Sequence, residues 1–178
     1  MADRFARTPA LAGAPSGRFG LAPGAAAPVT VEALADLPMA QAIAAPGVDL
    51  DARLAGRGEL RRLGPGQRLV LGATAQALAD LAPEVSAVDQ DGARARIGVS
   101  GPGAEALLAR GVGADLHASR FGEGISAPML FGRIGIVLAR LGPARWEILV
   151  PRSYALSLWE ELLEAGRSIG LEARGPQA

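Results

Sequence analysis

Two stretches of similar pattern decide the fold of this 178-residue chain: RLVLGATAQALADL (residues 68–81) and EILVPRSYALSLWEEL (residues 147–162). Each begins with an apolar run typical of a buried strand and continues through a hydroxyl residue, Thr74 or Ser153, that can cap a helix. Each ends with apolar side chains at helical spacing. The repetition predicts an α+β fold made of two pseudo-symmetric strand–helix units with antiparallel sheets.

Further strands are expected beside each unit. Segments 85–89 and 93–99 flank Asp91-Gly92, a dipeptide typical of a tight hairpin. Segments 125–140 and 145–150 predict a second, longer hairpin. Both hairpins would place antiparallel strands next to the repeated units.

The chain length suits one domain of ordinary size. We expect a single α+β domain over residues 29–172, with sub-halves of about 29–91 and 92–172. Residues 1–28 are rich in Ala, Gly and Pro, which indicates an N-terminal arm that is either disordered or extended, with Phe5 or Phe19 docked on a partner. Residues 173–178 form a tail.

The residue census excludes several kinds of chemistry. Eighteen basic and eighteen acidic residues give no net charge, so nothing favours nucleic acid or an anionic membrane as a partner. All basic residues are arginine and cysteine is absent, which excludes Schiff-base lysines and thiolate metal sites. The sequence contains no membrane-spanning run and no secretory signal, so we expect a cytoplasmic protein. Aromatic residues make up only 4%, which predicts a core that another chain helps to complete.

Two motifs in the second half imitate functional sites. Gly101-Pro-Gly103-Ala-Glu-Ala106 fits the dinucleotide fingerprint, but the preceding strand alternates arginine with apolar residues, unlike a strand buried on both faces. We interpret it as a tight turn at a helix start. Asp115 and His117 lack a third metal ligand, and we expect His117 to order its loop by a hydrogen bond.

An apolar loop and a helix start are the other candidate sites. Phe121, Met129 and Phe131 lie on or beside a glycine-rich loop, where they either fill the chain's own core or form a patch for a partner. Arg152 precedes Ser153 at the start of the best helix, where it is either an anion site or a plain surface residue.

Three segments resemble the gamma subunit of heterotetrameric sarcosine oxidase: SGPGAEALLARGVGADLH (100–117), FGEG (121–124) and ILVPRSYALSLWEELLEA (148–165). The resemblance covers about residues 29–170. The chain departs from the family at Arg110-Gly-Val-Gly113, where Lys-Gly-Cys-Pro is common, and at Met129, where threonine is common. The family's fold is similar to the folate-binding part of the glycine-cleavage T-protein.

The resemblance implies a non-catalytic subunit of a flavin-dependent N-methyl amino acid oxidase, with sarcosine as the first candidate substrate. It would assemble with alpha, beta and delta subunits and help enclose the cavity for one-carbon transfer to tetrahydrofolate. FAD, FMN, NAD, tetrahydrofolate and zinc would be held by the partner subunits, and this chain would carry no catalytic, cofactor or metal site. We expect its partner contacts at Phe121, Met129, Phe131 and Arg152.

Three alternatives remain at this point. The chain is a gamma-type subunit of N-methylglutamate dehydrogenase, a stand-alone folate-binding protein of T-protein type, or, on the GPGAEA turn alone, a Rossmann-type reductase.

Overall fold

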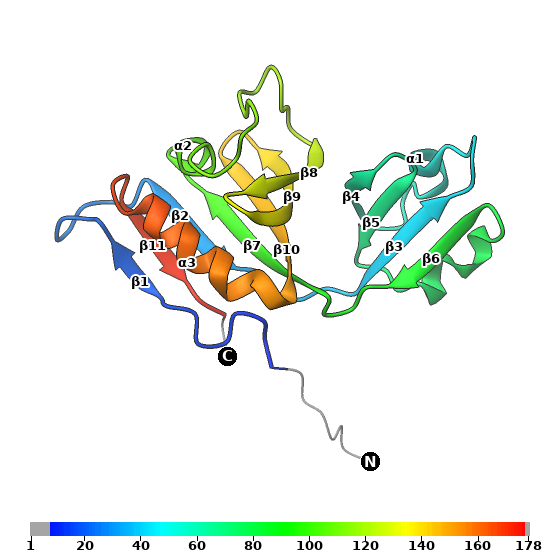
Figure 1. The fold of residues 1–178 in the computed structure, drawn as a ribbon, viewed down its shortest axis with the longest axis horizontal. Coiled ribbons are helices and arrows are strands. Elements are labelled where there is room, and N and C mark those ends of the chain that lie inside the picture. The colour runs from blue at the N-terminus through cyan, green and yellow to red at the C-terminus, as the bar shows by residue number, and fades with distance from the viewer. Residues whose placement is uncertain (1–7, 177–178) are drawn as a thin grey trace, which may run out of the picture.

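Residues 8–176 are described by a computed structural model, in which they form two β-sheets joined by two linkers (Figure 1). The larger sheet contains, in spatial order, β1 (Gly17–Phe19), β11 (Leu171–Arg174), β2 (Val29–Ala33), β7 (Arg94–Ser100), β10 (Arg145–Pro151), β9 (Ile134–Gly142) and β8 (Ser126–Phe131). The smaller sheet contains β4 (Glu59–Gly64), β5 (Gln67–Leu71), β3 (Met39–Ala44) and β6 (Val85–Asp89). Every neighbouring pair is antiparallel except β11–β2, and this mixed architecture confirms the predicted fold class.

Short helices connect these strands. They are α1 (Leu50–Arg53), the 3₁₀ helix η1 (Gln76–Leu81), α2 (Ala104–Leu108), the 3₁₀ turn η2 (Arg152–Tyr154) and α3 (Ala155–Gly166). The two repeated units are therefore β5–η1 and β10–α3. Thr74 Oγ1 accepts a hydrogen bond from Ala77 N at 3.3 Å, although Ala75 takes the N-cap position of η1. The predicted cap at Ser153 is wrong, because η2 intervenes and Tyr154 takes the N-cap position without a side-chain bond.

The main core lies between the larger sheet and α3, which crosses one face of it (Figure 1). On α3, Leu158, Trp159 and Leu162 are fully buried, and on the sheet Ile97 and Ile148 lie opposite one another on β7 and β10. Apolar side chains three and four residues apart give α3 one continuous apolar stripe, and alternation gives each strand a matching face. The strongest periodicity in the sequence thus forms the largest core.

The smaller sheet has its own core on one face. Leu50 and Leu54 from the α1 region and Leu78 from η1 pack against Ala42 and Val70 of the sheet. Asp49 caps α1, since its Oδ1 accepts hydrogen bonds from two backbone N–H groups. Each repeated unit therefore covers one face of its own sheet.

The two sheets meet at a buried carboxylate. Glu147 on β10 is 0% exposed, and it accepts hydrogen bonds from Arg61 Nε of β4 at 2.7 Å and from Arg96 Nε of β7 at 2.8 Å. Each guanidinium also brings its Nη2 to the same oxygen that its Nε contacts. The paired contacts on both oxygens satisfy a charge that would otherwise be costly to bury.

A small apolar cluster lies beside this ion pair. Met39, Leu69 and Leu71 of the smaller sheet pack against Val137 and Leu149 of the larger one. Ser126 Oγ of β8 adds a polar contact, because it accepts a hydrogen bond from Arg62 N of β4 at 2.8 Å. The interface between the sheets is therefore partly ionic and partly apolar.

The hairpin predicted at Asp91-Gly92 is wrong, whereas the longer predicted hairpin is present as the antiparallel pair β9–β10, with its first arm divided in two. Strands β6 and β7 flank Asp91-Gly92 but enter different sheets, because Asp91 Oδ1 accepts a bond from Met39 N at 2.8 Å and holds this turn as a linker. Segment 125–140 is two strands, β8 and β9, that turn at Gly132, whose φ is +57°. The predicted sub-halves also need correction, since β2 pairs with β7 and so belongs to the larger sheet.

The described part of the N-terminal arm is held against the domain. Strand β1 pairs with β11, which continues to Arg174 beyond the predicted domain boundary. Leu11 is buried in the main core, and Trp159 Nε1 donates a hydrogen bond to Pro15 O at 2.9 Å. Phe19 packs against this chain's own core instead of a partner. Phe5 lies outside the described residues.

Replacement of the buried carboxylate predicts a large loss of stability. Glu147→Gln leaves the charge of Arg96 uncompensated, whereas Arg61 keeps its ion pair with Glu59. We expect the free energy of unfolding to fall by about 3 kcal/mol. Urea unfolding measures this, with Glu164→Gln as control, because Glu164 pairs with Arg167 on an exposed helix face and should cost at most about 0.5 kcal/mol. Equal losses in the two variants would contradict the assigned role.

The arm gives a second prediction. Trp159→Phe removes the hydrogen bond to Pro15 O and should weaken the arm's attachment by about 1 kcal/mol. Amide hydrogen exchange in residues 9–16 should accelerate accordingly. Trp146→Phe is the matched control, because Trp146 Nε1 has no hydrogen-bond partner among residues 8–176. Unchanged exchange in Trp159→Phe would show that other contacts hold the arm.

Candidate functional site

The glycine-rich loop after α2 is anchored on Trp146. The Phe121 ring stacks on the Trp146 ring with centroids 5.7 Å apart, and the Arg140 guanidinium lies 4.7 Å from the Trp146 centroid. Arg140 also donates hydrogen bonds to the carbonyls of Leu116 and Phe121 at 3.0 and 3.2 Å. These contacts fix the loop from its inner side, so Phe121 is a buried core residue.

Strand β8 is an outer strand of the larger sheet, and its side chains alternate between two faces. Phe131 is buried and packs so closely on Gly111 that a Cβ there would lie 2.6 Å from the ring. Met129, on the same face, is half-buried against the main core. Leu130 and Pro128 point to the opposite face and are exposed.

Arg152 lies at the end of β10 beside the N-terminal arm. Its Nη2 donates a hydrogen bond to Thr8 O, and its Nη1 is buried without a partner among the described residues. Arg152 therefore holds the arm against the domain. The sequence alone suggests two other roles for it, an anion site or a plain surface residue.

Two of the four residues expected at a partner interface are buried inside this chain. Phe121 and Phe131 are buried in this chain's own core and offer little surface, whereas Met129 and Arg152 remain partly accessible. The exposed apolar residue of this region is Leu130 on the far face of β8. Strict alternation along Ser126–Phe131 was the signal that separates Leu130 from its two neighbours.

The two imitation motifs have structural roles. A Cβ on Gly101 would lie 2.4 Å from Pro28 O, and one on Gly103 would lie 2.7 Å from Val29 Cγ2, so both glycines serve close packing on β2. Strand β7 is antiparallel to both of its neighbours, which is incompatible with a Rossmann crossover. His117 is exposed, and its Nδ1 lies 2.9 Å from Ser119 Oγ within the loop, as expected.

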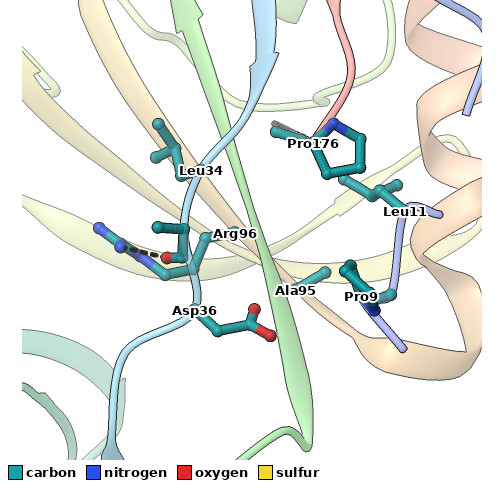
Figure 2. Close-up of a pocket in the computed structure, with 10 residues that line it drawn as sticks. Pro9, Leu11, Leu34, Asp36, Ala95, Arg96 and Pro176 are labelled. Atoms are coloured by element: carbon teal, nitrogen blue, oxygen red, sulfur yellow. Dashed lines mark hydrogen bonds between the residues drawn. The ribbon is translucent and has the colours of Figure 1, made fainter. Parts of the chain in front are cut away.

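A cavity of about 270 Å³ lies between the arm and the linker from β2 to β3 (Figure 2). Pro9 and Leu11 line one side, and Leu34 and Asp36 line the other. Arg96 turns its guanidinium away from the hollow and donates to Ala35 O at 2.8 Å. The lining is mainly small and apolar, with the Asp36 carboxylate as its accessible charge.

This cavity does not fit tetrahydrofolate. Pockets that hold ligands of that size measure about 300–1,000 Å³ and combine aromatic side chains with several converging polar groups. The cavity is smaller, and its lining is aliphatic apart from Asp36 and the diverted Arg96. Within residues 8–176, no group of three His, Cys, Asp or Glu side chains is placed to hold a metal ion. In the same part of the chain, no helix has the length and apolar character needed to cross a membrane.

Comparison with known sequences identifies the family. The profile of the GCVT N-terminal domain matches residues 68–178, which is more than half of the chain. The chain therefore belongs to the GCVT N-terminal domain family. No curated protein matches the sequence.

Solved structures share the fold. A chain of the heterotetrameric sarcosine oxidase from Corynebacterium sp. U-96, solved in complex with pyrrole 2-carboxylate, aligns over 79% of this chain and 85% of its own length, with 23% identity and a TM-score of 0.69. The glycine cleavage system aminomethyltransferase T from Bartonella henselae aligns over 84% of this chain, with 18% identity and a TM-score of 0.59. This chain spans 48% of that aminomethyltransferase. The predicted likeness to part of the T-protein fold is confirmed.

The placement of Phe121 predicts a stability effect. Phe121→Leu loses the stack on Trp146 and should lower the free energy of unfolding by about 1 kcal/mol, with a changed near-UV circular dichroism signal from Trp146. Ile125→Leu on the exposed side of the same loop should stay within about 0.5 kcal/mol. A Phe121→Leu variant of unchanged stability and weakened association with other chains would place Phe121 in an interface instead.

Proposed function

We propose that this chain is a non-catalytic, gamma-type subunit of a multi-subunit flavin-dependent oxidoreductase that acts on an N-methyl amino acid. The observation that carries the proposal is the alignment with a chain of heterotetrameric sarcosine oxidase over most of both chains. The aligned part is 79% of this chain and 85% of that chain. The aminomethyltransferase, in contrast, is about twice as long as the part that this chain matches.

The polar side chains that could bind a substrate or transfer a proton make structural contacts instead. His117 orders its loop, Arg140 holds the loop carbonyls, and Arg152 contacts the arm. The partners in this proposal are alpha, beta and delta subunits, which hold FAD, FMN, NAD, tetrahydrofolate and zinc. This chain contributes packing surface and helps to enclose the cavity for one-carbon transfer. Sarcosine is the first candidate substrate and N-methylglutamate the second.

Affinity purification tests the proposal. The full chain, tagged at its C-terminus and expressed in its native cell, should co-purify a yellow flavoprotein with three further chains. The same fraction should oxidise sarcosine or N-methylglutamate. The preferred substrate identifies the amino acid, and consumption of oxygen with release of hydrogen peroxide separates an oxidase from a dehydrogenase. Recovery of the chain as a folded monomer without flavin would contradict the proposal.

Titration with tetrahydrofolate tests the alternative that this chain is a stand-alone folate-binding protein. The isolated chain should bind it no more tightly than millimolar. The cavity beside the arm is small, and the larger, open hollow of about 650 Å³ beside Arg152 has no aromatic side chain in its lining. Isothermal titration calorimetry measures the affinity. A micromolar dissociation constant for the isolated chain would favour a stand-alone folate-binding protein.

A further inference from the structure

The larger sheet presents its second face, opposite α3, to the smaller sheet, and only part of that face is covered. Glu147 and Leu149 of β10 point to this face and are fully buried beneath the smaller sheet. Pro151, two residues further, is only half-buried, and Arg94 lies directly opposite it on β7. The contact between the sheets therefore ends before the last row of the larger sheet.

A groove of about 380 Å³ begins where this contact ends. We define the inter-sheet groove by six of its lining residues: Gln41, Gln67, Arg94, Pro128, Met129 and Pro151. Gln41 Nε2 donates to Gln67 Oε1 at 3.2 Å, so these two amides largely satisfy one another on the smaller-sheet side. The charged member of the groove is Arg94.

Arg94 is half-buried and has no counter-charge in the described chain. Its Nε is buried without a hydrogen-bond partner, and no ion pair among residues 8–176 involves its guanidinium. Burial lowers the pKa of Arg94. The next outward-facing arginine on the same strand, Arg96, is fully paired with Glu147. A desolvated guanidinium with free donors is a strong binding site for a carboxylate.

The rims of the groove are apolar. Leu130 lies opposite Gly135 of β9, which also lines the groove, so the Leu130 side chain shares this face. On the smaller sheet, Ile43 lies opposite Gln67 and Val88 lies opposite Gln41. Leu130, Ile43 and Val88 are 57%, 39% and 52% exposed. Exposed apolar side chains around an arginine are typical of a protein–protein contact.

We propose that the inter-sheet groove receives a segment of a partner subunit that places an Asp or Glu carboxylate against Arg94 and an apolar side chain between Leu130 and Ile43. This inference rests on the proposed function, which supplies the partner subunit. Charge complementarity selects an acidic segment, because Arg94 lacks an acidic neighbour within residues 8–176. The two apolar rims select a polypeptide over a small acid.

Substitutions at Arg94 test the proposal in the assembled complex. Arg94→Leu and Arg94→Glu should weaken binding of the chain to a complex that lacks it by about 30-fold or more, since a desolvated charge loses its partner. Leu130→Asp should also weaken binding, because it places a charge on the apolar rim of the groove. Arg167→Glu on the exposed face of α3 is the control and should change affinity less than about twofold.

The isolated chain provides a second readout. Arg94→Leu removes a buried polar atom without a partner, so its midpoint of thermal unfolding should equal or exceed that of the wild type. Weakened assembly together with unchanged or raised stability supports the inference. Wild-type affinity in Arg94→Glu would overturn it and leave the proposed function intact.

The remaining outcomes name other occupants, and each overturns the proposal. A wild-type dimer that Arg94→Glu dissociates would place a second copy of this chain in the groove. A loss of stability in Arg94→Leu that removal of residues 1–7 reproduces would assign the groove to this chain's own terminus. Saturable binding of succinate that Arg94→Leu abolishes would assign it to a small acid. A wild-type chain that joins no flavoprotein complex would remove the proposed function and this inference together.

Discussion

Burial of one carboxylate between two arginines determines how the two sheets of this protein are placed. Glu147 can be ionised in the interior only if both of its oxygens find donors, and these come from β4 of one sheet and β7 of the other. If the contact were only apolar, the two sheets could slide past each other by a fraction of a side chain. Paired N–H···O bonds allow much less displacement, because their distances and angles are narrowly defined. The apolar cluster of Met39, Leu71 and Leu149 then fills the space that this geometry leaves.

The same ion pair also organises the linker from β2 to β3. Arg96 reaches Glu147 with one side of its guanidinium and Ala35 O with the other, so the linker is tied to the interface between the sheets. Asp91 holds the second linker by its bond to Met39 N. Both crossings between the sheets are therefore fixed by hydrogen bonds to side chains, which makes the groove beyond them a stable surface feature.

The sequence predicts those elements whose pattern is local. Helix α3 and the two strand–helix units follow from the spacing of their apolar residues. The hairpin at Asp91-Gly92 could not be predicted correctly, because the partner that converts it into a linker, Met39 N, lies 52 residues away. Strand β4 could not be predicted from the sequence, because its buried side chain is Arg61. An arginine is buried at this position only through its ion pair with Glu147, which lies 86 residues away in the sequence. For the site, local alternation separates Phe131 from Leu130, whereas the exposure of Arg94 depends on where the smaller sheet ends.

Strand order has a consequence for synthesis. Strand β11 (Leu171–Arg174) lies between β1 and β2, which are made well before it. Until β11 has been made, β2 keeps an open backbone edge and β1 has no partner strand. The larger sheet therefore closes only after β11 has left the ribosome, and this closure joins strands that are far apart in the sequence. During that interval, a chaperone would meet an unpaired β2 edge that the folded protein no longer presents.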